Sequence, residues 1–282
     1  MNLSFRICTE ADLAAADDIL VAAYQFKGSR KKLLRHYLSL QPDGWWLALV
    51  DGNPIGFGGA VDYGAFSSVG MLSVYPSWQR RGIGEALTKQ ILAWCEEHAC
   101  PTMILEAEEL AVSLYARLGF VEEDTTPQMF MDEPRLDMQA SPGVEIMQAK
   151  DIPELAAFDT PYFGAERTKV FISHLRENPG RAFVTRNDTG QITGYLFAQP
   201  RMLGPWVAST ASEAEKLLVQ ALALPFENGP SVSIPAMNEE GLQLLRRYHF
   251  SQRSIDHYMR RGAPLQSGQR VMIYAQASPA LG

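Results

Sequence analysis

The alternation of apolar and polar residues predicts an α+β fold for the first half of the chain. Leu3–Ile7 alternates as a half-buried strand does, whereas Trp45–Val50 is a continuous apolar block. Further strands are predicted at 55–63, 66–74, 102–107 and 129–131, with a β segment from Phe120, and helices at about 10–24, 29–40, 83–98 and 110–118. Thr9, followed by Asp12, is the expected N-cap of the first helix.

The same pattern begins again after residues 134–143, which are rich in turn-formers and poor in apolar residues and are expected to be a linker. A strand at 144–147, a helix to about residue 158, and strands at 182–184 and 192–197 repeat the earlier order. Residues 238–250 repeat 108–120 at a constant offset of 130, so that Leu114 falls on Leu244 and Phe120 on Phe250. The pattern favours a repeated domain, and the alternative is an unrelated α+β domain.

Residues 71–87 contain the most informative stretch of the chain. An apolar run at 71–74 is followed by Gln79-Arg80-Arg81-Gly82-Ile83-Gly84 and then directly by the helix. The free N–H groups and the positive dipole end of a helix start form an anion site, and glycine lets a phosphate approach the backbone. Neither Gly-x-x-x-x-Gly-Lys-Ser/Thr nor Gly-x-Gly-x-x-Gly is present, which speaks against the usual nucleotide loops. The alternative is a basic loop that only shapes the strand–helix unit.

Composition narrows the choice of partner. The chain has 282 residues and a net charge of −7, which argues against a general nucleic-acid binder and gives weak support for a cationic substrate. Cys95, His98 and Cys100 match no standard zinc spacing, so no metal is expected. Three cysteines without a framework spacing, and no apolar run of about 20 residues, predict a cytoplasmic protein away from the membrane.

Two motifs resemble the signatures of the GCN5-related N-acetyltransferases (GNAT). These are the Gln-x-x-Gly-x-Gly loop at Gln79 and a Leu-Tyr-x-x-x-Gly-Phe stretch that starts at Leu114, in the family's order and at its usual separation. Together with the internal repeat, the resemblance implies a complete GNAT domain at 1–135 followed in tandem by a degenerate GNAT-like domain at 144–282, joined by a linker at 136–143. Stretches at 158–167, 203–208 and 234–238 also resemble the two-domain YitH-like acetyltransferases of bacteria.

The resemblance implies acetyl-CoA as co-substrate and assigns the residues that would hold it. The loop N–H groups would bind the pyrophosphate, and backbone groups of the preceding strand would bind pantetheine, with one N–H polarising the thioester oxygen. The implied cofactor-binding residues are Leu72, Val74, Gln79, Arg80, Arg81, Gly82, Ile83 and Gly84. At the offset of 130, Gly82 and Gly84 fall on Ser212 and Ala214, so one cofactor per chain is expected.

Tyr115 and Glu106 are the catalytic candidates. The Tyr115 phenol, with a reference pKa near ~10, would protonate the leaving thiolate, although the residue also fits the apolar face of its helix. Glu106 is the first candidate for the general base and Asp62 the second, and either would otherwise be an exposed strand residue. Glu108 stands where the family often has Asn, which questions the usual contact to the pantetheine arm.

Three histidines have no supporting motif and are expected at the surface or in the core: His36, His174 and His257. The leading hypothesis is direct acetyl transfer to a primary amine, either a small molecule or a lysine-like acceptor, with the second domain shaping the acceptor side. The rival is a non-catalytic acyl-CoA sensor or interaction module, and a different acyl group is a third option. Neither nucleic acid nor membrane is an expected partner, and a homodimer is left open.

Overall fold

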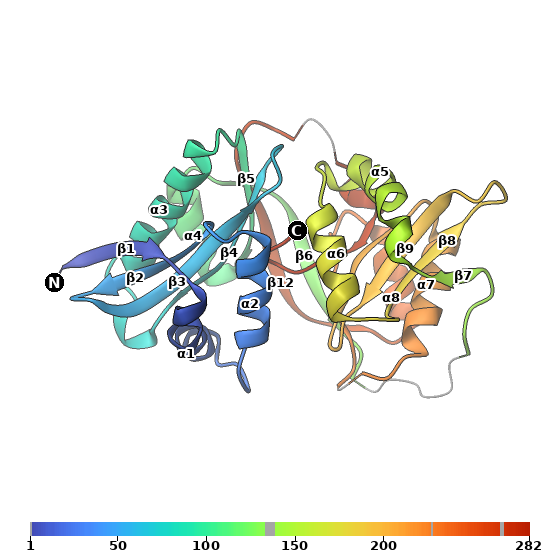
Figure 1. Cartoon of the computed structure of the whole chain (residues 1–282), viewed down its shortest axis with the longest axis horizontal. Helices are drawn as coiled ribbons and strands as arrows, with labels where there is room; N and C mark the ends of the chain where they lie inside the picture. The colour runs from blue at the N-terminus through green and yellow to red at the C-terminus, as the bar shows by residue number, and fades with distance from the viewer. Residues whose placement is uncertain (1, 133–138, 227, 266–267) are drawn as a thin grey trace.

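Two sheets flanked by helices form the protein: a larger one built mainly from the first half of the sequence and a smaller one built from the second half (Figure 1). The computed structural model describes residues 2–132, 139–226, 228–265 and 268–282. Within them, the larger sheet has the order β1 (Leu3–Ile7), β2 (Trp45–Val50), β3 (Asn53–Asp62), β4 (Ser67–Val74), β5 (Thr102–Glu108), β12 (Ser251–Gly262), β6 (Val121–Phe130) and β11 (Ser231–Ser233). The smaller has the order β13 (Ile273–Ala275), β10 (Leu203–Ala208), β9 (Ile192–Ala198), β8 (Ala182–Arg186) and β7 (Val144–Ile146).

Helices cover both faces of the larger sheet. The first-half helices are α1 (Leu13–Tyr24), α2 (Lys31–Leu40), α3 (Ile83–Glu97) and α4 (Glu109–Arg117). Buried side chains of α1 and α2 form one core on one face, and those of α3 and α4 form another core on the opposite face. Thr9 and Asp12 form the expected capping box, although a 3-10 turn at Glu10–Asp12 precedes α1. The predicted first-half helices are therefore confirmed.

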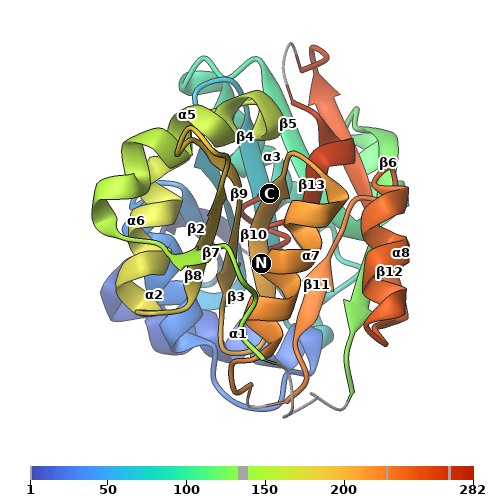
Figure 2. The same ribbon diagram turned by 90° about the vertical axis from the view of Figure 1, so that its right-hand side faces the viewer.

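The second half repeats this plan with α5 (Ile152–Phe163), α6 (Thr168–Glu177), α7 (Ala211–Leu222) and α8 (Glu239–Arg247). Figure 2 shows these helices with the second half facing the viewer. The expected repetition is confirmed, and α5 continues beyond the predicted end at residue 158. Of the predicted linker, residues 133–138 lie outside the described part of the chain. The division of the sequence at 136–143 therefore stays a prediction.

Strand β12 joins the halves, because it comes from the second half but lies between β5 and β6 of the first. In the β6–β12 pair Asp256 stands opposite Thr126, its own counterpart at the offset of 130. The pseudo-twofold axis that relates the repeats therefore passes through this pair. The first half was expected to end in two β segments, at Phe120 and at 129–131, but they form the single strand β6.

The C-terminal segment, residues 277–282, lies between the two halves (Figure 1). Ala280 and Leu281 are each 1% exposed. The segment packs on β4 so closely that a Cβ atom at Gly70 would lie 2.7 Å from the Ala280 Cα. The Tyr63 hydroxyl donates to the Leu281 carbonyl at 2.9 Å, and Gln199 Nε2 donates to the Ala277 carbonyl at 3.1 Å. Side chains from both halves thus hold this segment in the interior.

Candidate active site

The site is organised around the separation of β4 from β5. The two strands pair in parallel at Ser67–Val69 of β4 with Met103–Leu105 of β5. Beyond this point Met71 has a φ of 59° and the register with β3 shifts. A cavity of about 470 Å³ opens there, lined by residues of β4, β5, α1, α2 and α4 together with the C-terminal segment and parts of the second half.

The backbone of Leu72 and Val74 faces this opening. Tyr75 donates its N–H to the Ile55 carbonyl of β3, so by alternation the groups of residues 72 and 74 point the other way. Their carbonyls accept side-chain hydrogen bonds instead, Leu72 from the Tyr24 hydroxyl and Val74 from Gln79 Nε2, each at 3.0 Å. The two predicted pantetheine residues thus lie on the edge that an extended ligand would pair with.

The glycine loop brings an open helix start to the same region. Arg80 and Gly82 both have positive φ, at 59° and 80°, and Gly82 is the N-cap of α3 without a side-chain capping bond. A Cβ at Gly82 would meet nothing within 4 Å, so an anion can approach the backbone there. Arg81 lies over the Trp78 ring, 4.8 Å from its centroid. Ile83 is 1% exposed, so its backbone is the part that remains for a ligand.

Two tyrosines reach the cavity from opposite sides of the sheet. Tyr115, on α4, is buried, and this burial raises its pKa above the ordinary value, with a smaller contribution from the nearby Glu108 carboxylate. Tyr24, at the end of α1, holds the Leu72 carbonyl. Sequence reasoning missed Tyr24 because it follows the apolar pattern of its helix.

Glu106 lies on β5 at the junction of two cavities, the one of about 470 Å³ and another of about 230 Å³. Its side chain is 3% exposed. Its Oε1 accepts a hydrogen bond from Gln276 Nε2 at 2.5 Å and lies 3.9 Å from the Arg270 guanidinium. Burial raises the Glu106 pKa, against the opposing effects of Arg270 and Gln276. A raised pKa makes the carboxylate a stronger base than that of an exposed glutamate.

Asp62, the second candidate base, lines neither cavity. Its side chain accepts the N–H of Gly64 at 2.8 Å at the end of β3, and its carbonyl accepts from Lys169 Nζ at 2.7 Å. The structure therefore brings Glu106 and Tyr115 to one cavity and leaves Asp62 outside it.

Asp256 is a second residue that sequence reasoning missed. It stands directly opposite Glu108 in the β5–β12 pair, and both carboxyl groups line the larger cavity. Burial and the Glu108 charge raise its pKa to about 6, although Gln128 Nε2 donates to it at 2.9 Å. Asp256 reaches the cavity because β12 of the second half lies between β5 and β6 of the first. No motif around Asp256 in the sequence therefore indicates its position.

Two of the three histidines lie in the core where the halves meet. The rings of His36 on α2 and His174 on α6 are 5.3 Å apart and line the larger cavity. Burial, reinforced by His36 and Arg167, lowers the His174 pKa to about 3, so this ring is neutral. His257 is paired with Glu109 and Glu122. Among the described residues, no group of three or more His, Cys, Asp or Glu side chains lies close enough to hold a metal ion.

In the second half, the strand edge and the helix start that correspond to those of β4 and α3 are paired or capped by the protein itself. Strand β13 pairs with β10 at Trp206 and Val207, along the edge that corresponds to the open edge of β4. Only Ser209 and Thr210 separate β10 from α7, and the Thr210 side chain caps α7 by accepting the Glu213 N–H at 3.2 Å. Ser212 lies in the first turn of α7, where no glycine loop precedes the helix.

Comparison with known proteins finds acetyltransferase matches in both halves of the chain. Residues 13–120 match the acetyltransferase (GNAT) family, and residues 155–275 match an acetyltransferase (GNAT) domain. The chain is 25% identical over 245 residues to the uncharacterized N-acetyltransferase YitH of Bacillus subtilis (strain 168), covering 83% of each. Among the described helices, none is both long and apolar enough to cross a membrane.

Solved structures extend the similarity over nearly the whole chain. A protein from Pyrococcus horikoshii, provisionally named as an acetyltransferase, is 26% identical with a TM-score of 0.87, covering 99% of this chain and 96% of its own. A tandem GNAT protein from the clavulanic acid biosynthesis pathway shares the fold, with a TM-score of 0.65 at 16% identity, covering 93% of this chain and 99% of its own.

Proposed function

The chain belongs to the GNAT family of acetyltransferases and carries two such domains in tandem, and on this premise we propose that it transfers the acetyl group of acetyl-CoA directly to a primary amine. One observation carries the proposal. The open edge of β4 and the uncapped start of α3 lie beside a cavity that holds a buried carboxyl group, Glu106, and a buried phenol, Tyr115. We propose the cytoplasm as its location.

The residues fit acetyl-CoA as a co-substrate, which supplies an activated acetyl thioester. The backbone from Gln79 to Gly84 would hold its pyrophosphate, with charge from Arg80 and Arg81. The edge at Leu72 and Val74 would bind the pantetheine arm as a strand binds its neighbour. These proposed roles are supported by the empty space beside Gly82 and by the direction in which the backbone groups of Leu72 and Val74 point.

Two proton transfers complete the proposed reaction. As the amine nitrogen forms its bond to the acetyl carbon, the carbon–sulfur bond breaks, and Glu106 takes the proton that the nitrogen loses. Tyr115 donates its proton to the sulfur, so that the products are an amide and a thiol. Glu106 and Tyr115 line the same cavity, which supports the proposal that they act as base and acid in one reaction.

The test is the release of free thiol from acetyl-CoA with a panel of primary amines, beside calorimetry with acetyl-CoA alone. We expect acetyl-CoA to bind whether or not an amine is present. Free thiol should be released only when an amine is present. Binding without thiol release for any amine would favour an acyl-CoA sensor. The absence of binding would overturn the proposal.

A further inference from the structure

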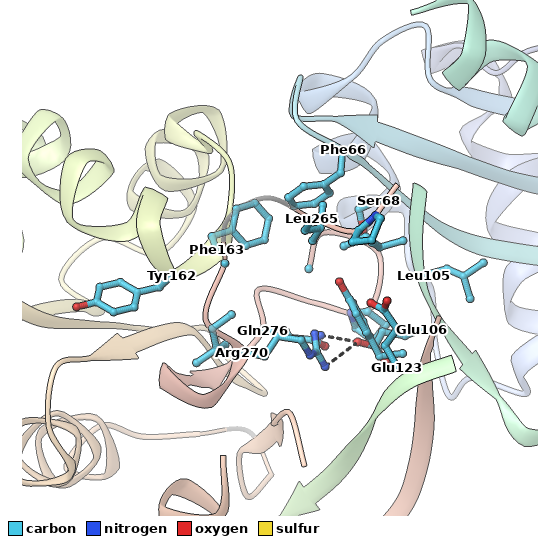
Figure 3. A pocket seen from close by; sticks show the side chains of 17 residues that line it. Phe66, Ser68, Leu105, Glu106, Glu123, Tyr162, Phe163, Leu265, Arg270 and Gln276 are labelled. Atoms are coloured by element: carbon cyan, nitrogen blue, oxygen red, sulfur yellow. Dashed lines mark hydrogen bonds and ion pairs between the residues drawn. The ribbon is translucent and has the colours of Figure 1, made fainter. Parts of the chain in front are cut away.

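A second cavity, of about 230 Å³, shares Glu106 with the larger cavity and is lined by residues of both halves (Figure 3). We call it the interdomain chamber, because β4, β5 and the loop before β4 form one side, and α5 with the segment around β13 forms the other. Glu106 and Pro279 line both this chamber and the larger cavity. None of the described residues that form its walls belongs to α3 or α4, so the chamber reaches the proposed general base through elements other than those that carry Tyr115 and the glycine loop.

The walls of the chamber are mainly aromatic and apolar. Phe66 comes from the first half and Phe163 from α5, and their rings meet at 5.1 Å with an angle of 61°. Other apolar or aromatic side chains complete the walls: Ile104, Leu105, Tyr162, Tyr258, Pro264, Leu265, Ile273 and Pro279. Such walls suit a ligand with a compact apolar or aromatic body.

Two residues that line the chamber, Glu106 and Gln276, each carry a buried hydrogen-bond acceptor without a donor. Gln276 donates its Nε2 to Glu106 Oε1, which leaves Gln276 Oε1 and Glu106 Oε2. Neither oxygen has a hydrogen-bond partner among the described residues. The Glu106 side chain is 3% exposed and Gln276 is 2% exposed. Buried acceptors are rarely left unpaired, so these two oxygens call for a ligand that brings N–H groups.

The charged groups at the edge of the chamber are already paired. Arg270 donates its Nε to Asp124 at 3.1 Å and lies over the Tyr258 ring, 3.6 Å from its centroid. Glu123 accepts a hydrogen bond from Arg260 at 2.5 Å. Among the described residues that line the chamber, Arg270 is the one Lys or Arg side chain. A ligand carboxylate or a second ammonium group would therefore find no unpaired counter-charge here.

We propose that the interdomain chamber binds the acceptor, and that the acceptor is a small primary amine with one compact aromatic or apolar body. This inference rests on the proposed function. The amine nitrogen donates to Glu106 Oε2 and Gln276 Oε1, and the body packs against the contacting rings of Phe66 and Phe163. Gln276 is thus a substrate-binding residue that the second half supplies to the catalytic centre of the first.

Matched amines test the substrate class in the full-length protein by steady-state thiol release. 2-Phenylethylamine and phenylalanine share a ring and an amine, but phenylalanine adds a carboxylate. Butylamine and 1,4-diaminobutane differ by a second ammonium group. The proposal expects kcat/KM to be at least about tenfold higher for the first member of each pair. Equal or reversed preferences would overturn it.

Two variants test the location. Gln276→Leu removes the acceptor oxygen, and Leu265→Trp fills the chamber, so each should raise the KM for 2-phenylethylamine about tenfold and leave the KM for acetyl-CoA unchanged. Val271→Trp, at a position 45% exposed, is the matched control for the added ring and should change neither KM. Unchanged amine KM values in both chamber variants would overturn the inference, while the proposed function would stand.

Calorimetry with 2-phenylethylamine separates failure of the inference from failure of the proposed function. If no amine releases thiol, the proposed function fails. In that case, binding of 2-phenylethylamine that Leu265→Trp abolishes and Val271→Trp preserves would still support the chamber as an amine site. The absence of binding, or binding that both tryptophan variants preserve, would overturn it.

Discussion

The two halves differ in what satisfies the backbone hydrogen-bonding groups of one strand edge and one helix start. Each places a strand edge and a helix start side by side, at β4 with α3 and at β10 with α7. In the second half β13 pairs with the edge and Thr210 caps the helix, so the protein satisfies its own backbone groups. In the first half the edge diverges from β5 and α3 begins at Gly82 without a side-chain cap. The candidate site is therefore marked by a strand edge without a neighbouring strand and a helix start without a side-chain cap, and the shared fold alone does not mark it.

The second half lacks an open site of its own, but it contributes residues to the site of the first half. Strand β12 places Asp256 beside Glu108, and Gln276, which follows β13 directly, donates to Glu106. The C-terminal segment then lines the larger cavity. The chain therefore has one proposed site built by two domains.

The largest expected effect comes from separating the halves. A fragment of residues 1–132 lacks β12, so β5 and β6 lose the strand between them, together with buried residues such as Tyr258 and Met259. Losing several buried side chains at ~3–5 kcal/mol each exceeds the usual stability of a domain, ~5–15 kcal/mol. The fragment should show no cooperative urea unfolding by circular dichroism, whereas the full chain should. A cooperative transition in the fragment would show that the first half folds alone.

A paired substitution tests the two helix starts. Gly82→Glu introduces a side chain at a φ of 80° and a negative charge at the proposed pyrophosphate position. Acetyl-CoA affinity should fall at least ~100-fold, or ~2.7 kcal/mol. Ser212→Glu makes the matched change in the first turn of α7 and should alter the affinity less than ~2-fold. Similar losses in both variants, measured by calorimetry, would remove the asymmetry.

Tyr115→Phe tests the proposed acid. Because the phenol acts only as the thiolate leaves, kcat should fall ~100-fold or more while the KM for acetyl-CoA changes less than ~3-fold. Tyr248→Phe, next to α8 in the second half, is the control and should leave both values unchanged. Wild-type kcat in Tyr115→Phe would exclude the phenol from the reaction.

The pH dependence of kcat/KM tests Glu106. Its pKa is raised by burial, with Asp256 acting in the same direction and Arg270 opposing, and only the ionised form accepts a proton. Activity should therefore fall as the pH drops through a midpoint above the ordinary value of ~4.3 for Glu. Glu106→Gln should lower kcat/KM ~100-fold and abolish this acid limb. An unchanged limb in the variant would assign it to another group.

The smallest expected effect concerns stability where α2 and α6 meet. Folded His174 has its pKa lowered to about 3, whereas the unfolded side chain titrates near ~6.5. The unfolded state thus binds more protons between these values, and the free energy of unfolding should fall as the pH decreases through that range, by at most ~1.4 kcal/mol per unit. His174→Gln should reduce this slope in urea titrations at pH 4, 5 and 6. Equal slopes in wild type and His174→Gln would contradict the assignment.

Local features of the site could be predicted from the sequence, and long-range ones could not. The glycine loop and the Tyr115 motif are contiguous stretches, and strands such as Trp45–Val50 follow from one apolar run. Asp256 and Gln276 escaped notice because each reaches the site through pairing far along the chain, and Gln276 is 170 residues from Glu106. The β segments expected at Phe120 and at 129–131 form the single strand β6, and β12 lies between β5 and β6, which only the three-dimensional pairing shows.

The central claim is that the chain holds one cofactor site, in the first half, because the second half closes its own. Calorimetric titration of the wild-type chain with acetyl-CoA tests this most directly. We expect a stoichiometry of one acetyl-CoA per chain, with binding lost in Gly82→Glu and kept in Ser212→Glu. A stoichiometry of two, or one that survives Gly82→Glu and disappears in Ser212→Glu, would contradict it.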